Sequence, residues 1–247
     1  MNILKIFLIA GVLFLVACAT KDYNPESLKN YTAKQILTMG EQAMAKGDYK
    51  NSVKYFEAID ALYPFDREAQ QGQLDVIYAY YKTEDYASAL AAADRYIHLY
   101  PVGKHSDYAY YMKGIVNFDK DRTWLQNLYT KRAEELDLSN LQDSFMAFEL
   151  LIKLFPKSIY TQDAEKRMVH IRSLLARHEL QVAKFYFARK AYVAAVNRAS
   201  YLIKHFAGAP QVAAALKIML QSYRALGAEK QANDTLRVLK LNFPQEV

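Results

Sequence analysis

The sequence predicts an all-α protein, a right-handed superhelix of about five stacked helical hairpins. The main observation is an interval of 37 residues, because Gly47-Asp48-Tyr49 is matched by Glu84-Asp85-Tyr86 at that distance (48 to 85). The aromatic-proline pairs Tyr63-Pro64 and Tyr100-Pro101 keep the same interval (63 to 100). A second observation is that the chain has only 8 glycines and 6 prolines, so long linkers are not expected. One supersecondary unit is therefore repeated along the chain.

The first unit contains two amphipathic helices. Apolar residues recur there at steps of three and four, at Ile36, Met39 and Ala43 and then at Val53, Phe56, Ile59 and Tyr63. Gly47-Asp48 between them supplies a helix stop and the next N-cap, and Pro64 ends the second helix. Helix-turn-helix units of about this length are typical of tetratricopeptide repeats, whose curved surface holds other polypeptides.

Small residues stand where the two helices of a hairpin should approach closely. These positions are Gly40, Ala89, Ala93, Ala195, Ala199 and Ala232. A larger side chain would push the helices apart. The alternative is that they are ordinary helix-favouring alanines.

The third unit carries an insertion. Tyr100 and Phe155 are 55 residues apart, 18 more than the repeat, and the surplus falls between Phe118 and Leu141. We assign it to a loop over residues 119–140, which holds the apolar residues Trp124, Leu125, Leu128 and Tyr129. This cluster either folds back onto the body or contacts a partner.

The fourth unit has a lengthened helix. Phe155 and Phe206 are 51 residues apart, a surplus of 14, which is about four helical turns. The apolar stripe runs without interruption through Ala164, Met168, Ile171, Leu175, His178, Val182 and Phe185. This stripe predicts one helix of about 27 residues, roughly 40 Å long, with His178 as a core or interface residue. A fifth unit ends at Phe243-Pro244, 37 residues after Phe206.

The N-terminus predicts a lipid anchor. Residues 1–17 combine Lys5, a short apolar run and Leu15-Val16-Ala17, as in a signal peptide that ends in a lipobox. Cys18 follows and is the only cysteine, so it cannot form an internal disulfide. We expect acylation of Cys18 after cleavage, a lipidated tether over 18–30 and the repeats over 31–247. A chance cysteine beside an ordinary signal is the alternative. Ala19, in place of aspartate, resembles the sorting signal for the outer membrane.

Positive charge is concentrated in the fourth unit. Residues 160–205 carry nine basic residues against Asp163, Glu165 and Glu179, and this surplus of six equals the net charge of the whole chain. The run is either a solvated face or a surface for an acidic protein or anionic lipid. We do not expect a nucleic-acid partner, because an exported, tethered protein rarely meets one.

The sequence contains no recognisable catalytic motif. The five histidines form no His-Glu-x-x-His pair, and no second cysteine could complete a zinc site. Glycine-rich phosphate loops and the Gly-x-Ser-x-Gly turn are also missing from the sequence. We therefore expect no enzyme activity, no metal and no cofactor.

Several stretches resemble the BamD family, the tetratricopeptide lipoproteins of the outer-membrane β-barrel assembly complex. The resemblance covers nearly the whole mature chain. The stretches are Tyr63-Pro64-Phe65, residues 73–82, residues 107–114, residues 155–160 and Ala194-Ala195-Val196-Asn197-Arg198. Asp75 and Asn197-Arg198 are not needed by a generic repeat.

The resemblance implies a non-enzymatic scaffold that faces the periplasm. Its N-terminal repeats, 31–118, would receive unfolded outer-membrane proteins through their C-terminal strand, at Tyr63, Phe65, Tyr78, Tyr81 and Lys82. Its C-terminal repeats, 141–247, would bind BamA through Arg198, Asn197 and Arg189. Other lipoproteins of the complex are further expected partners.

Two alternatives remain open. The chain could be another tetratricopeptide lipoprotein, a scaffold for peptidoglycan enzymes or pilus assembly, or a lipoprotein hydrolase with a dispersed site. The sequence also departs from the family at Glu135-Leu136-Asp137, where members often have Asp-Arg-Asp.

Overall fold

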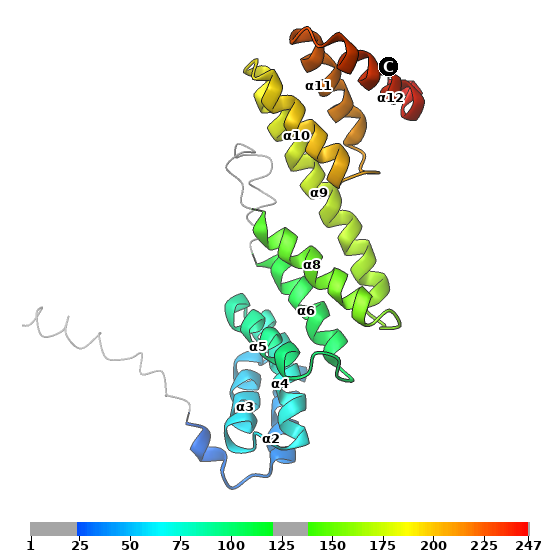
Figure 1. Ribbon diagram of the computed structural model, residues 1–247. Helices are drawn as coiled ribbons and strands as arrows, with labels where there is room; N and C mark the ends of the chain where they lie inside the picture. The colour runs from blue at the N-terminus through cyan, green and yellow to red at the C-terminus, as the bar shows by residue number, and fades with distance from the viewer. Residues whose placement is uncertain (1–23, 121–137, 247) are drawn as a thin grey trace, which may run out of the picture. The chain divides into compact units, whose positions relative to one another are not determined.

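The computed structural model describes residues 24–120 and 138–246, and every regular element in these two ranges is a helix (Figure 1). The predicted all-α class is therefore confirmed. The chain divides into two compact units, residues 1–79 and residues 80–247, and the division falls inside one helix.

The first unit contains the short 3₁₀ helix η1 and three α-helices. Their bounds are η1, Pro25–Leu28; α2, Ala33–Ala45; α3, Tyr49–Leu62; and α4, Arg67–Lys82, which continues into the second unit. Thr32 caps α2 in a capping box, because its hydroxyl accepts from the Gln35 backbone N–H and the Gln35 side chain accepts from the Thr32 N–H. Helices α2 and α3 pack as one hairpin.

The second unit contains the remaining helices. Their bounds are α5, Tyr86–Leu99; α6, Ser106–Asp119; α8, Ser139–Leu154; α9, Thr161–Ala188; α10, Tyr192–His205; α11, Val212–Ala225; α12, Glu229–Asn242; and η3, Pro244–Glu246. Neighbouring helices along the chain pack against each other, as Figure 1 shows for α6 with α8 and α9 with α10. Helix α9 has 28 residues, which confirms the predicted long helix.

The turn inside the hairpins is a repeated structure. One residue of the turn takes a left-handed backbone conformation in four hairpins, at Gly47, Glu84, Lys190 and Gly227. The next residue closes the turn through its N–H, as Asp48 does by donating to the Ala43 carbonyl at 2.9 Å. Asp48 then caps α3 through its side chain, as the sequence predicts.

The aromatic residue that ends each hairpin is also in one conformation. Its φ lies between −138° and −123°, and its N–H donates to the carbonyl four residues before it, at Tyr63, Tyr100, Phe155, Phe206 and Phe243. Four of the five precede a proline, which disfavours the helical conformation for the residue before it. The interval of 37 residues therefore comes from a shared helix ending.

Close approach of α2 and α3 depends on Gly40. A Cβ added at Gly40 would overlap the ring of Phe56, which is fully buried. The hydroxyl of Ser52 also donates to the Gly40 carbonyl at 3.1 Å. The third hairpin repeats this arrangement with Gly114, Phe148 and Ser144, whose hydroxyl donates to the Gly114 carbonyl at 2.7 Å.

The predicted small alanines are all buried. Ala89, Ala93, Ala195, Ala199 and Ala232 have at most 1% of their surface exposed, which argues against ordinary helix-favouring positions on the surface. Large side chains fill the space beside them in the second unit, where Leu202 and Leu239 are buried in the cluster that contains Ala195 and Ala199.

Some predicted segments lie outside the described residues. Helix α6 ends at Asp119 and α8 begins at Ser139, so the predicted insertion falls between the helices of the third hairpin. Most of it, including Trp124, Leu125, Leu128, Tyr129 and Glu135-Leu136-Asp137, is outside the described ranges, as are the signal peptide and Cys18. Among the described helices, none has the length and apolar character to cross a membrane.

Two glycine substitutions in the first unit test the close approach. Replacing Gly40 with alanine should lower the free energy of unfolding by about 1–3 kcal/mol, because the methyl group overlaps Phe56 in a packed core. Gly72, on α4, is the matched control, because its added Cβ would lie 3.5 Å from Ile59 Cδ1. Gly72→Ala should leave stability unchanged or raise it by up to about 1 kcal/mol. Urea unfolding followed by circular dichroism measures the stability of both variants. Equal losses of unfolding free energy in Gly40→Ala and Gly72→Ala would contradict this account.

Candidate functional site

Tyr63 and Phe65 lie at the loop between α3 and α4. The Tyr63 hydroxyl donates to the Tyr31 carbonyl at 2.6 Å, so this tyrosine ties the segment before α2 to the end of α3. Phe65 is different, since 97% of its surface is exposed. Almost the whole surface of this phenylalanine is therefore accessible to another molecule.

Tyr78 belongs to the same unit and packs against another tyrosine. Its ring meets Tyr49 edge to face, with 6.0 Å between the ring centroids, and the side chain is half-buried. Aromatic pairs of this geometry stabilise helix packing. Part of the Tyr78 ring remains open to solvent.

Tyr81 and Lys82, at the end of α4, belong to the second unit. The Tyr81 hydroxyl donates to the Asp119 carboxylate at 2.6 Å, joining α4 to the end of α6. Lys82 is exposed in the last turn of α4. Of the five residues predicted to bind clients, three therefore lie in the first unit and two in the second.

Asp75 is a half-buried carboxyl on α4. The Gln71 side-chain amide donates to it at 2.9 Å. Burial raises the pKa of the Asp75 carboxyl from 3.8 to about 6. The hydrogen bond from Gln71 opposes this rise, and the charge of Glu41 on α2 adds to it. The first unit therefore contains a carboxyl that destabilises it when ionised.

Asn197 and Arg198 lie side by side on α10 at a shallow pocket. Its volume is about 400 Å³, and Tyr186, Ala194 and Tyr201 complete its lining. Arg198 Nη1 lies 3.4 Å from Glu179 Oε2 of α9, with 48% of the arginine side chain and 12% of the glutamate side chain exposed. The guanidinium has five N–H donors, so this pairing leaves capacity for an acidic group of another molecule.

Arg189 lies at the C-terminal end of α9. Its guanidinium carbon is 3.4 Å from the centroid of the Phe185 ring, which is a cation-π contact, and the residue is exposed. Arg189 does not line the pocket of Asn197 and Arg198. The structure thus brings two of the three predicted partner-binding residues together.

A second hollow adjoins this pocket through Tyr201. It has a volume of about 190 Å³ and is lined in part by His178, Glu179 and Phe206. His178 is half-buried, with its Nδ1 3.9 Å from the Glu179 Oε1. The glutamate therefore lies between His178 and Arg198.

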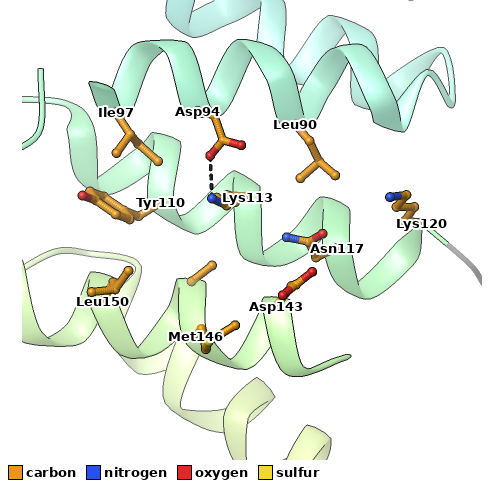
Figure 2. A pocket seen from close by; sticks show the side chains of 11 residues that line it. Leu90, Asp94, Ile97, Tyr110, Lys113, Asn117, Lys120, Asp143, Met146 and Leu150 are labelled. Carbon is orange, nitrogen blue, oxygen red and sulfur yellow. Dashed lines mark hydrogen bonds and ion pairs between the residues drawn. The ribbon is translucent and has the colours of Figure 1, made fainter. Parts of the chain in front are cut away.

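Sequence reasoning missed a third hollow. Helices α5, α6 and α8 form a groove of about 470 Å³ with apolar walls and the buried residue Asn117 on its floor (Figure 2). The only signal in the sequence was an asparagine inside the apolar run Ile115-Val116-Asn117-Phe118. Across residues 24–120 and 138–246, no group of three histidine, cysteine or acidic side chains is arranged to hold a metal ion.

Comparison with known proteins gives a consistent result. The sequence profile of the YfiO family, described as outer membrane lipoprotein, matches residues 29–239. The chain is 35% identical over 236 residues to the outer membrane protein assembly factor BamD of Neisseria meningitidis serogroup B, covering 94% of this chain and 88% of that protein. It is 30% identical to the proteins of the same name from Haemophilus influenzae, covering 98% of this chain and 91% of that one, and from Vibrio cholerae, covering 95% and 97%.

Asp75 should make the stability of the first unit depend on pH. Because its folded pKa is raised, the folded state holds the proton more tightly, and this stabilisation is lost as the pH rises from about 4 through about 6. Asp75→Asn should therefore raise the free energy of unfolding by about 2 kcal/mol at pH 7.5 and change it little at pH 4.

Urea unfolding at both pH values, with hydrogen exchange over residues 67–79 to localise the effect, measures this difference. Asp66→Asn, which makes the same change at an exposed position just before α4, is the control for removal of a carboxyl. A lower stability of Asp75→Asn at pH 7.5 would contradict the assignment.

Proposed function

Because the chain belongs to the YfiO family of outer-membrane lipoproteins, we propose that it is a non-enzymatic scaffold of the β-barrel assembly machinery. It binds BamA and unfolded outer-membrane proteins, and so supports their folding and insertion into the outer membrane. The observation that carries this proposal is the match to assembly factors along almost the whole chain, at 35% identity over 94% of its length.

The proposed mechanism is binding, not bond chemistry. Helical hairpins of this kind present side chains on a backbone that their own packing fixes. An unfolded client offers apolar side chains and a terminal carboxylate, and these need aromatic surface and a cation. Tyr63, Phe65 and Tyr78 in the first unit and Tyr81 and Lys82 in the second supply both.

Exposure distinguishes the roles of these residues. Phe65 is almost fully exposed and Lys82 is exposed, so both are available for direct contact with a client. Tyr63 and Tyr81 use their hydroxyls inside the protein, to Tyr31 and to Asp119. These two tyrosines therefore contribute ring surface to the binding of a client.

The C-terminal repeats supply the contact with BamA. Arg198 is half-exposed beside Asn197, and Glu179 orients its guanidinium from α9. An arginine held in this way can bond an acidic side chain of a partner with little further loss of rotamer freedom. Arg189, beside Phe185, adds a second cation at the end of α9.

The N-terminal cysteine places this scaffold at the membrane. Acyl chains on Cys18 attach it to the outer membrane, with residues 18–30 as the lipidated tether and the repeats in the periplasm. More than one acyl chain is needed for stable attachment, which lipoproteins satisfy.

Reversing the charge of Arg198 tests the binding of BamA. Arg198→Glu should lower the affinity for BamA at least about 30-fold, because a charged hydrogen-bonded pair is replaced by repulsion. Lys204→Glu is the matched control, since it makes the same change of charge at an exposed position of the same helix and should retain affinity. Purified variants are compared by pull-down and by surface plasmon resonance. Equal binding by both variants would contradict the assignment of Arg198, and a wild-type protein that captures no barrel component would overturn the proposed function.

Substitution of Cys18 tests the anchor. Cys18→Ala should remain unacylated and leave the outer-membrane fraction, whereas Ala19→Asp should keep its acyl chains and move to the inner membrane. Mass spectrometry of the mature N-terminus and separation of the two membranes on a sucrose gradient measure these outcomes. A wild-type N-terminus without acyl chains would contradict the proposal.

A further inference from the structure

The groove between α5, α6 and α8 has the properties of a binding site that the proposed function has not used. Figure 2 shows its arrangement, with Leu90 and Ile97 on α5, Met146 and Leu150 on α8, and Asn117 on α6 between them. All three helices belong to the second unit, and α6 packs against both neighbours. The groove is therefore built by helices whose mutual packing fixes it.

Both walls of the groove are apolar, and one is strongly exposed. Met146 has 51% and Leu150 has 44% of its surface exposed, one turn apart on α8. Leu90 and Ile97 are two turns apart on α5, so the apolar wall there is about 10 Å long. Exposed apolar side chains along one wall of a groove, opposite a second apolar wall, mark a contact with another molecule.

The charged residues that line the groove cancel one another. Lys113 on α6 forms an ion pair with Asp94 on α5, which Figure 2 marks with a dashed line. Lys120 and Asp143 also line the groove and carry opposite charges. With no net charge among its lining residues, the groove favours an uncharged occupant over an acidic or a basic one.

Asn117 presents a polar, uncharged side chain to the groove. Only 4% of the surface of this residue is exposed, and it is among the residues that line the groove. A hydrogen bond made to its amide in a largely apolar groove is stronger than one in open solvent, so a ligand that makes this bond gains affinity. A carboxamide has both a donor and an acceptor, which match the C=O and the N–H of one peptide group.

We propose that this groove binds an extended, uncharged and apolar stretch of an unfolded client polypeptide, with one of its peptide groups bonded to Asn117. In an extended chain successive side chains point to opposite sides. Alternate residues of such a segment contact the α5 wall and the α8 wall while its backbone lies along α6. The apolar wall of about 10 Å spans about three extended residues. The inference rests on the proposed function, which supplies unfolded clients, and it adds a second client site in the second unit.

A defined peptide tests the inference with the full-length protein. The probe is a fluorescein-labelled octapeptide in which pairs of leucines alternate with pairs of threonines, so that an extended chain presents leucine on both sides. Its ends are blocked, and its affinity is measured by fluorescence anisotropy. Asn117→Leu, which is close in shape and removes the amide, should weaken binding at least about 10-fold and leave the melting temperature unchanged or higher. Met146→Lys should weaken binding by a similar factor. Val169→Lys, at an exposed position outside the groove, is the control and should leave the affinity for the peptide unchanged.

Three outcomes would overturn the inference. The first is unchanged affinity in both groove variants. The second is equal or tighter binding of an octapeptide in which two threonines are replaced by aspartate or by lysine. The third is a dimer of the wild-type protein in sedimentation that Met146→Lys dissociates, because a second copy would then occupy the groove. In each case capture of BamA by the wild-type protein would leave the proposed function standing, so the two failures can be distinguished.

Discussion

The close approach of two antiparallel helices is the constraint on which this structure depends. In the first and third hairpins a glycine on one helix faces a buried phenylalanine on the other, and a serine four residues before the phenylalanine bonds the glycine carbonyl. The phenylalanine ring fills the space that the missing side chain leaves, so the interface is dense without a cavity. The serine bond adds a polar contact that fixes the register of the two helices. The fourth hairpin has small buried residues in its core as well, at Ala195 and Ala199.

This packing leaves the outer faces of the helices available for binding. The chain has 20 tyrosines, and several of them tie one helix or loop to another through their hydroxyls, as Tyr111 does with Asp163 at 2.7 Å. Other side chains remain on the surface, among them Phe65, Met146 and Arg198. A scaffold of this kind needs little conformational change to bind, because its fixed backbone already holds the contact residues in place.

Much of the fold could be predicted because it depends on local chemistry. The left-handed turn residue, the Asp48 cap and the aromatic residue before proline act within a few residues of the chain, so the 37-residue interval predicts the turns and helix ends correctly. The long helix α9 was predictable because an uninterrupted apolar stripe needs no knowledge of its neighbours. Gly114 lies two intervals of 37 residues after Gly40 (40 to 114) and so could have been identified, but its contact with Phe148 could not, because the insertion of 18 residues displaces this phenylalanine from the interval.

The candidate sites were less predictable, since they depend on which side chains meet in space. The pairing of Arg198 with Glu179 crosses from α10 to α9, and the bond from Tyr81 to Asp119 joins residues 38 apart in sequence. No pattern in the neighbouring sequence indicates either of these two contacts. The groove at Asn117 was missed for the same reason, because an asparagine in an apolar run does not show that the residue lines a groove between three helices.

The central claim is that this chain acts by holding other polypeptides at defined surfaces. Photo-crosslinking in living cells tests it most directly, with a photo-reactive amino acid placed in turn at Phe65, Met146, Arg198 and, as a control, Val169. The account predicts crosslinks to unfolded outer-membrane proteins from the first two positions and to BamA from the third. It predicts neither from Val169. Crosslinks that are the same at all four positions, or that include no outer-membrane protein and no assembly component, would contradict it.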